Sequence, residues 1–496
     1  MNQGRSPHMY VPRAGRTPGE SAPHGLAIAA GLAVLATAFI GPNVALVIYA
    51  AAVLALGLTL LWRPKEPPIM VFIFVYQWLQ ASVAPIYGNF TGLTPDEVAK
   101  YMGRHDLACY LSLTGVLALA LGMRLAIGRA SIDLHGRVVS FVGTRPVGFW
   151  LRLYLGGAVF SALCNAIAYK AGGLTQVLLA LAQVKWAAYM LLTFATFAVP
   201  GRAKLPWMGV CLLEFALSLG GFFSSFKDIF FYAFLGLIGS GIRFRPRSLL
   251  LLSLGGIVAV FLGVLWSAVK TDYREYVLAR DFNQSVNVSY GDAVSHLGEL
   301  IVNLDGAGLA KGADTLAHRL MYTEFFGVAL GNVPENVEHT RGALWGDAVL
   351  RTFMPRLIFS DKAAVYDSEL TRQYTGINVS SIEQGTSISM GYIAEAYIDW
   401  GPVLMFVPIL LLGYILGFVY RWLLAAPGRD GVIGAGLSTF TLMQAYALET
   451  SSLKMIPAIG LCVAADLVIL KFIAPLIWGV QQRPARIARQ AWLRGG

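Results

Sequence analysis

The strongest constraint on this chain is a series of apolar runs, each close to the length that an α-helix needs to cross a bilayer. A spanning helix needs about 20 apolar residues, whereas a membrane strand alternates over about 10. The runs are continuous, so we expect an all-α, polytopic membrane protein with about 12 transmembrane helices. Their expected positions are 25–41, 43–62, 68–85, 107–127, 148–168, 186–200, 206–222, 228–242, 248–268, 400–420, 431–450 and 455–478.

Composition supports this fold class and excludes several others. Only 13% of the residues are charged, against about 25% in a soluble globular protein. The 4 cysteines and 7 histidines show no metal-ligand spacing. We therefore expect no metal and no cofactor. A further apolar segment, 172–183, is too short to span and is expected to lie in the interface or to re-enter the membrane.

Basic residues predict the orientation of the helices. With the N-terminus in the cytoplasm, the cytoplasmic segments hold 20 lysines and arginines, and the short outer connections hold 6. This bias follows the positive-inside rule. The expected organisation is a cytoplasmic tail at 1–24, helices one to nine within 25–268, a large periplasmic loop at 269–400, helices ten to twelve within 401–478, and a cytoplasmic tail at 479–496. For a bacterial protein this corresponds to the inner membrane.

The predicted loop is the longest polar segment of the chain. It holds 10 basic and 17 acidic residues and therefore has a net charge of −7. Since the whole chain has a net charge of +10, the rest of the chain has a net charge of +17. The basic excess therefore faces anionic lipid at the cytoplasmic side, and no nucleic-acid partner is expected. Helical spacing in 292–304 and 313–330 predicts amphipathic helices on the membrane surface.

One basic cluster in the loop is a candidate for anion binding. It runs from Arg351 through Arg356 to Lys362 among apolar residues. Arginine offers a planar fork of donors that matches phosphate and carboxylate. The competing interpretation is ordinary salt bridging to neighbours such as Asp347 or Glu369.

Two further segments carry charge near the ends of predicted spans. Lys270 and Arg274 continue from a spanning run and are mixed with tyrosines, which is equally typical of an interfacial helix end. Glu395 and Asp399 fall one turn apart on a predicted helix. A carboxylate there is either a general base on a sugar hydroxyl or part of a structural ion pair.

A few acidic residues fall inside the predicted spans themselves. They are Glu214, Asp228, Glu449 and Asp466. Intramembrane acids can form proton relays, but these four show no spacing that joins them into a chain. They would support a transporter.

The residues of the loop resemble those of the bacterial oligosaccharide repeat-unit polymerases, the O-antigen polymerase (Wzy) family. The resemblance covers mainly 319–401. It runs through Arg319-Leu320, Pro334, Gly342, Pro355-Arg356, Lys362 and the series Ser387, Ser389, Gly391, Glu395 and Gly401. The chain departs from the family at Lys227, where an arginine is common, and lysine is not a bidentate donor.

This resemblance implies a GT-C-like, metal-independent glycosyltransferase on the periplasmic face. Its substrates would be undecaprenyl-pyrophosphate-linked oligosaccharides, as donor and acceptor, with membrane lipids around it and a chain-length regulator as a partner. The product would be O-antigen, capsule or exopolysaccharide. Arg356, Arg351 and Glu395 are then the expected catalytic residues. The expected substrate-binding residues are Arg319, Lys362, Arg274, Lys270 and Lys227.

Two other functions remain open at the level of sequence. A glycan ligase, which transfers finished glycan to lipid A or protein, shares the architecture and the arginine chemistry. A flippase or transporter for the lipid-linked sugar would distribute charges through many spans, whereas here they gather in the loop.

Overall fold

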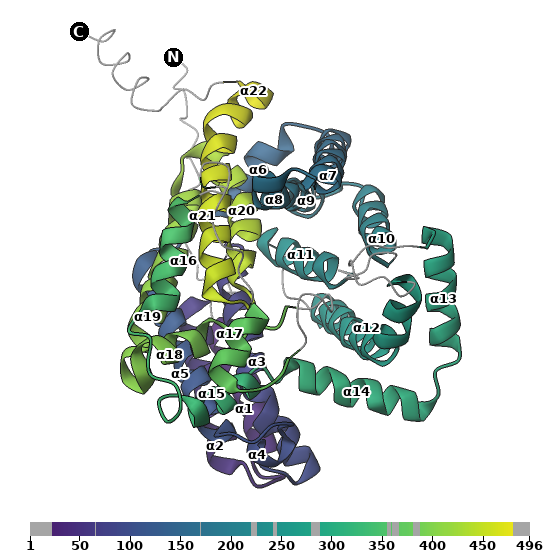
Figure 1. Ribbon diagram of the computed structural model, residues 1–496. Coiled ribbons are helices and arrows are strands. Elements are labelled where there is room, and N and C mark those ends of the chain that lie inside the picture. Colours follow the sequence, from purple (N-terminus) through teal and green to yellow (C-terminus); the bar gives the residue numbers. More distant parts are fainter. Residues whose placement is uncertain are drawn as a thin grey trace, which may run out of the picture.

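The computed structural model describes residues 22–64, 66–168, 170–219, 226–241, 246–278, 288–354, 359, 367–379 and 387–479. Within these residues every regular element is a helix, which confirms the all-α prediction (Figure 1). The first half comprises α1 (Ala22–Ala38), α2 (Val44–Leu61), α3 (Ile69–Thr91), α4 (Pro95–Val98), α5 (His105–Ile127), α6 (Leu134–Gly143), α7 (Val147–Ala168), α8 (Thr175–Ala182), α9 (Lys185–Phe197), α10 (Leu205–Leu219), α11 (Phe226–Gly239) and α12 (Pro246–Leu278).

The second half contains the predicted loop and the last spans. Its helices are α13 (Tyr290–Val302), α14 (Gly306–Leu320), α15 (Glu324–Asn332), α16 (Ala343–Phe353), α17 (Asp367–Thr375), α18 (Tyr392–Leu404), α19 (Phe406–Ala425), α20 (Gly428–Leu442), the short η3 (Met443–Ala445), α21 (Ser452–Val468) and α22 (Ala474–Trp478). The predicted helix 313–330 is therefore two helices, because α14 ends at Leu320 and α15 begins at Glu324.

Among the described residues, eight helical segments are long and apolar enough to cross a membrane, so the protein is membrane-embedded. They are Val44–Leu61, Ile69–Thr91, His105–Ile127, Val147–Ala168, Thr175–Phe197, Ser253–Val277, Phe406–Ala425 and Ser452–Trp478. The predicted number of twelve is not confirmed. Helices α1 and α10 are apolar but shorter, and α11 and α20 have only 14 and 15 residues.

One of these segments corrects the reading of 172–183. The sequence separated that short run from the span at 186–200. In the structure, α8 and α9 follow one another across a single turn, and together they form the candidate span Thr175–Phe197. Length rather than composition misled the prediction, because each half alone is too short to cross.

The centre of the bundle is the contact between α5 and α19. A Cβ on Gly413 would lie 2.2 Å from the Leu119 carbonyl oxygen, and one on Gly122 would lie 2.1 Å from that of Leu410. Small residues of this kind let two helix backbones approach closely in a membrane. Figure 1 shows α11 and α12 to one side of this centre, between the α8–α9 pair and α14.

One end of the bundle is closed by arginines, and we call it the arginine end. Arg63, Arg124 and Arg421 donate to carbonyls at the C-terminus of α5, at Ile127, Gly128 and Ala130. Arg137 donates to the Ala426 carbonyl beyond α19 at 2.9 Å. Cations at helix C-termini satisfy the last carbonyls and the helix dipole. All four belong to the set that the sequence assigned to the cytoplasm.

Candidate functional site: a cation-lined cavity

Four basic side chains from three helices line one cavity of about 370 Å³, which we call the cation cavity. The four are Lys227, Lys270, Arg274 and Arg319. All were among the substrate-binding residues expected from sequence, although 92 positions separate the first from the last. Their convergence is a property of the fold. Their role as substrate ligands remains a prediction.

Each cation is positioned by a regular element. Lys227 is in the first turn of α11, Lys270 and Arg274 are one turn apart on α12, and Arg319 is in the last turn of α14. Like charges one turn apart on a helix destabilise it. A lysine at a helix N-terminus also opposes the dipole. The local sequence is therefore unfavourable for Lys227, Lys270 and Arg274 without an anion, whereas the dipole of α14 favours Arg319 at its C-terminus.

Three of the four cations in the cavity form no ion pair among the described residues. In the described part of the chain, Lys227, Lys270 and Arg319 have no carboxylate within 4.0 Å, in contrast to buried pairs elsewhere. One such pair is Lys185 with Glu214, at 2.7 Å. Glu214, which the sequence suggested as a relay acid, is thus held by a lysine and by the hydroxyl of Tyr154. Gathered but unpaired cations are the arrangement expected of an anion site.

The remaining walls of the cavity are aromatic and polar. Its lining also includes Gln183, Asp228, Tyr232, Trp266, Met443, Gln444 and Tyr446. The Lys227 ammonium lies 5.5 Å from the ring centroid of Tyr446, a cation–π contact. Tyr232 stacks on Trp186 with centroids 4.2 Å apart and planes at 5°. These ring contacts fix the aromatic part of the cavity lining.

Asp228 is the residue that sequence reasoning missed. It is the acidic side chain in the lining of the cation cavity, half-buried beside Lys227. The sequence marked it only as an intramembrane acid that favours a transporter. The adjacency of Lys227 and Asp228 at the start of an apolar helix was the signal that could have placed it in the site.

Arg351 and Glu395, two of the three expected catalytic residues, do not line this cavity. Arg351 is half-buried on α16 and pairs with Asp347, with Nε and Oδ2 2.7 Å apart, as in the competing interpretation of the cluster. Arg356 and Lys362 lie outside the described residues, so their roles remain predictions.

Glu395 occupies a structural position. It is buried on α18, and its carboxylate accepts hydrogen bonds from the Ser452 backbone N at 2.7 Å and hydroxyl at 2.5 Å. It thereby caps the N-terminus of α21. Burial raises the pKa of Glu395 to about 7, and the two hydrogen bonds from Ser452 oppose that rise. The described residues include no basic partner for it within ion-pair distance.

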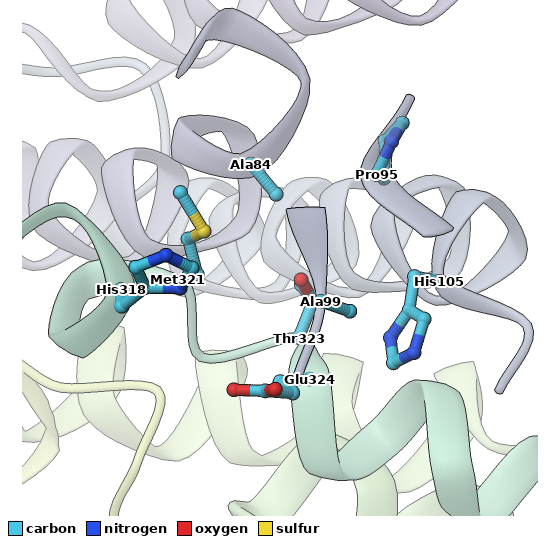
Figure 2. Close-up of a pocket in the computed structure, with 8 residues that line it drawn as sticks. All are labelled: Ala84, Pro95, Ala99, His105, His318, Met321, Thr323 and Glu324. Atoms are coloured by element: carbon cyan, nitrogen blue, oxygen red, sulfur yellow. The ribbon is translucent and has the colours of Figure 1, made fainter. Parts of the chain in front are cut away.

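A second pocket is a packing seam rather than a site (Figure 2). It lies where α14 and α15 meet α3 and α5, and its volume of about 10 Å³ is the space of about one water molecule. Glu324 on its wall accepts a hydrogen bond from the Lys100 backbone N at 2.6 Å. The ring of His105 contacts the Tyr101 carbonyl at 2.8 Å. Among the described residues, no group of histidine, cysteine and acidic side chains is placed to hold a metal ion.

Fold and cavity together define a membrane-embedded helical protein with a cation-lined cavity between its helices. The chain belongs to the family described as a domain of unknown function (DUF8712), whose model matches residues 149–422. The match contains all four cations and Asp228, whereas Met443, Gln444 and Tyr446 lie beyond it. No curated protein and no solved structure matches the chain.

Proposed function

We propose that the cation cavity binds the pyrophosphate of an undecaprenyl-pyrophosphate-linked oligosaccharide, and that the protein is a glycosyltransferase that polymerises such repeat units at the periplasmic face. The observation that carries the proposal is the convergence of Lys227, Lys270, Arg274 and Arg319 on one cavity. A pyrophosphate is the kind of multiply charged group that such a cluster fits. The resemblance of 319–401 to the polymerase family adds the reaction.

The charge of the cavity suits the leaving group of this reaction. When the bond between the donor sugar and the pyrophosphate breaks, negative charge grows on the phosphate oxygens. Cations held in place by α11, α12 and α14 stabilise that charge without rearranging. Arg274 and Arg319 supply planar donor forks, and Lys227 and Lys270 act as point charges.

Other residues in the lining of the cavity can act on the acceptor sugar. A hydroxyl of the acceptor sugar attacks the donor carbon and loses its proton as the new bond forms. Asp228 is the carboxylate in the cavity, so we assign it the role of general base in place of Glu395. The rings of Tyr232 and Tyr446 provide apolar surface for a sugar face.

The depth of the cavity agrees with an outward-facing site. Gly239, at the last turn of α11, lies against Pro67 near the arginine end, and Lys227 lies twelve residues before it. At 1.5 Å per residue Lys227 lies about 18 Å along α11 from Gly239. With the arginine end in the cytoplasm, as the positive-inside rule favours, the start of α11 and the cavity would lie on the outward side of that end.

This depth also supports a second candidate. A cluster of cations within the thickness of the helices, rather than in a loop above them, suits a flippase or transporter that carries the same lipid-linked anion. The two candidates share the ligand but differ in the product, so the product separates them.

The test uses a strain that lacks the gene, complemented with wild type, Arg319→Ala or Arg319→Lys, with Lys311→Ala as the control. Lys311 is exposed on the same helix but outside the cavity. We expect a full glycan ladder from wild type and the control, and single repeat units from Arg319→Ala at equal protein level. An undiminished ladder from Arg319→Ala contradicts the proposed site.

Other ladder patterns select the alternatives. Lipid-linked units that accumulate in the cytoplasm indicate a flippase. Long glycan that fails to reach its final acceptor indicates a ligase. A purified assay then asks whether wild type lengthens lipid-linked oligosaccharide without added partners, and it also shows whether a chain-length regulator is required.

A further inference from the structure

Helix α16 exposes an apolar face. Its exposed residues are Ala343, Gly346, Val349, Leu350 and Phe353, of which Leu350 is 61% and Phe353 75% exposed. Its polar side chains Asp347, Arg351 and Thr352 are only partly exposed. A helix that lies on a protein in water shows the opposite pattern.

Neighbouring helices of the predicted loop have the ordinary pattern. On α17 the exposed residues are Glu369, Arg372 and Gln373, and α14 exposes Lys311 and Asp314. The apolar stripe along α16 therefore sets this helix apart from α14 and α17, whereas among its described side chains α13 exposes large apolar residues only at its end, Ile301 and Val302.

The start of α16 is fixed beside the start of α21. Asp399 on α18 accepts hydrogen bonds from the backbone N of Leu344 at 3.1 Å and of Trp345 at 2.9 Å. Glu395, one turn earlier on the same helix, accepts from Ser452 at the start of α21. The two N-termini are thus held about one helical turn apart.

From this common level α16 and α21 run in the same direction (Figure 1). A Cβ on Gly460 would lie 2.5 Å from Thr352 Cγ2, so these two residues are in contact. Thr352 follows Leu344 by eight residues, and Gly460 follows Ser452 by eight. Both helices have advanced about 12 Å at the contact. Since α21 opens the candidate span Ser452–Trp478, α16 descends beside it.

The start of α17 lies at the same level as the N-termini of α16 and α21. Asp367, the first residue of α17, pairs with Lys454 in the first turn of α21. Ser387 accepts a hydrogen bond from the same Lys454 ammonium at 3.0 Å. The chain therefore leaves this level at Gly342 and has returned to it at Asp367.

We infer that α16 is a re-entrant half-helix embedded in the bilayer, and that its stripe of Ala343, Gly346, Val349, Leu350 and Phe353 contacts lipid acyl chains. Acyl chains are the occupant because α16 packs beside the candidate span Ser452–Trp478, and because the stripe contains no hydrogen-bonding side chain. The pair between Asp347 and Arg351 neutralises the charges that descend with the helix.

The test measures collision of spin labels with oxygen, which dissolves in acyl chains, and with a water-soluble nickel chelate. Single labels go on Val349, Leu350 and Phe353 of the full chain in liposomes, with Arg372 and Gln373 on α17 as water-exposed controls. All five are exposed, so the labels disturb no packed core. Native thiols are replaced first, since Cys211 is partly exposed.

We expect loss of nickel collisions and retention of oxygen collisions at the three α16 positions, with the reverse at the two α17 positions. Nickel collisions at Leu350 and Phe353 as frequent as at Arg372 overturn the inference, because the stripe then faces water. Exclusion of both reagents also overturns it, because a second protein surface then covers the stripe.

Discussion

The arginine end and the cation cavity hold the same kind of side chain in opposite environments. At the arginine end, the guanidinium groups of Arg63, Arg124 and Arg421 donate hydrogen bonds to backbone carbonyls at the C-terminus of α5. In the cavity, Lys227, Lys270 and Arg319 face open space without a carboxylate partner among the described residues. The comparison teaches that counting basic residues in a membrane protein does not locate function. The two groups differ in whether the protein itself supplies partners for their charged groups.

The largest effect is expected from removing a cavity cation. Lys270→Met should lower the turnover of lipid-linked oligosaccharide by about 100- to 1000-fold, the usual cost of one preorganised donor to a developing anion. Thermal stability should stay equal or rise, because a like charge beside Arg274 is removed. Turnover by the purified protein and unfolding in detergent are measured on the same sample. A large loss of thermal stability together with the loss of turnover would show that Lys270 has a structural role. The cation cavity would then not differ from the arginine end.

The reverse pattern is expected at the arginine end. Arg421→Met removes the shorter of two hydrogen bonds to the Ile127 carbonyl and leaves it only the 3.5 Å contact from Arg63, and an unsatisfied buried polar group costs about 1–3 kcal/mol. The unfolding midpoint should fall, while turnover per folded molecule stays at the wild-type level. A variant with wild-type stability but lost turnover would show that the arginine end takes part in the reaction.

The contrast also explains what the sequence could and could not predict. The helical membrane class follows from runs such as 43–62 and 107–127, because apolar length is a local property. Lys270 and Arg274 could be chosen from sequence because they continue from a spanning run, whereas Lys227 and Arg319 were chosen through the resemblance to the polymerase family. Their meeting in one cavity could not be predicted, because it depends on how α11, α12 and α14 pack.

Glu395 and Asp399, which the sequence puts one turn apart on a helix, both have partners that are distant in the chain. Glu395 has the sequence context of a general base near a membrane boundary. Its partner, Ser452, lies 57 residues away at the start of another helix. Asp399 is used in the same way by α16. Capping of a helix by a residue distant in the chain cannot be predicted from local sequence spacing. The capping roles of Glu395 and Asp399 could therefore not be found in the sequence.

Glu395 gives the next prediction, a change in the pH dependence of stability. Its folded pKa of about 7 lies above the ordinary value near 4.3. The neutral form is therefore favoured by folding. This contribution is fully present below about pH 4 and is lost as the pH rises through about 7. Between these limits wild type should lose up to about 1.4 kcal/mol per pH unit from this group.

The variant for this test is Glu395→Gln, which keeps an oxygen acceptor for Ser452 and cannot ionise. We expect a flatter dependence of the unfolding midpoint on pH between 4.5 and 7 than in wild type, measured in one detergent at constant ionic strength. Parallel curves for the two proteins would show that Glu395 does not change its protonation over this range.

The smallest effect is expected at a basic residue that belongs to neither group. Arg104 pairs with Glu335 at 2.9 Å, and both side chains are more than half exposed. Water and salt screen such a pair, so Arg104→Ala should cost between about 0 and 1 kcal/mol. Turnover should be unchanged, because Arg104 does not line the cavity. The variant therefore separates the loss of any positive charge near the membrane from the loss of one in the cavity. If Arg104→Ala lowered turnover as far as Lys270→Met, general electrostatic attraction of the anionic substrate would account for both effects. The effect of Lys270→Met would then no longer support the cavity as the binding site.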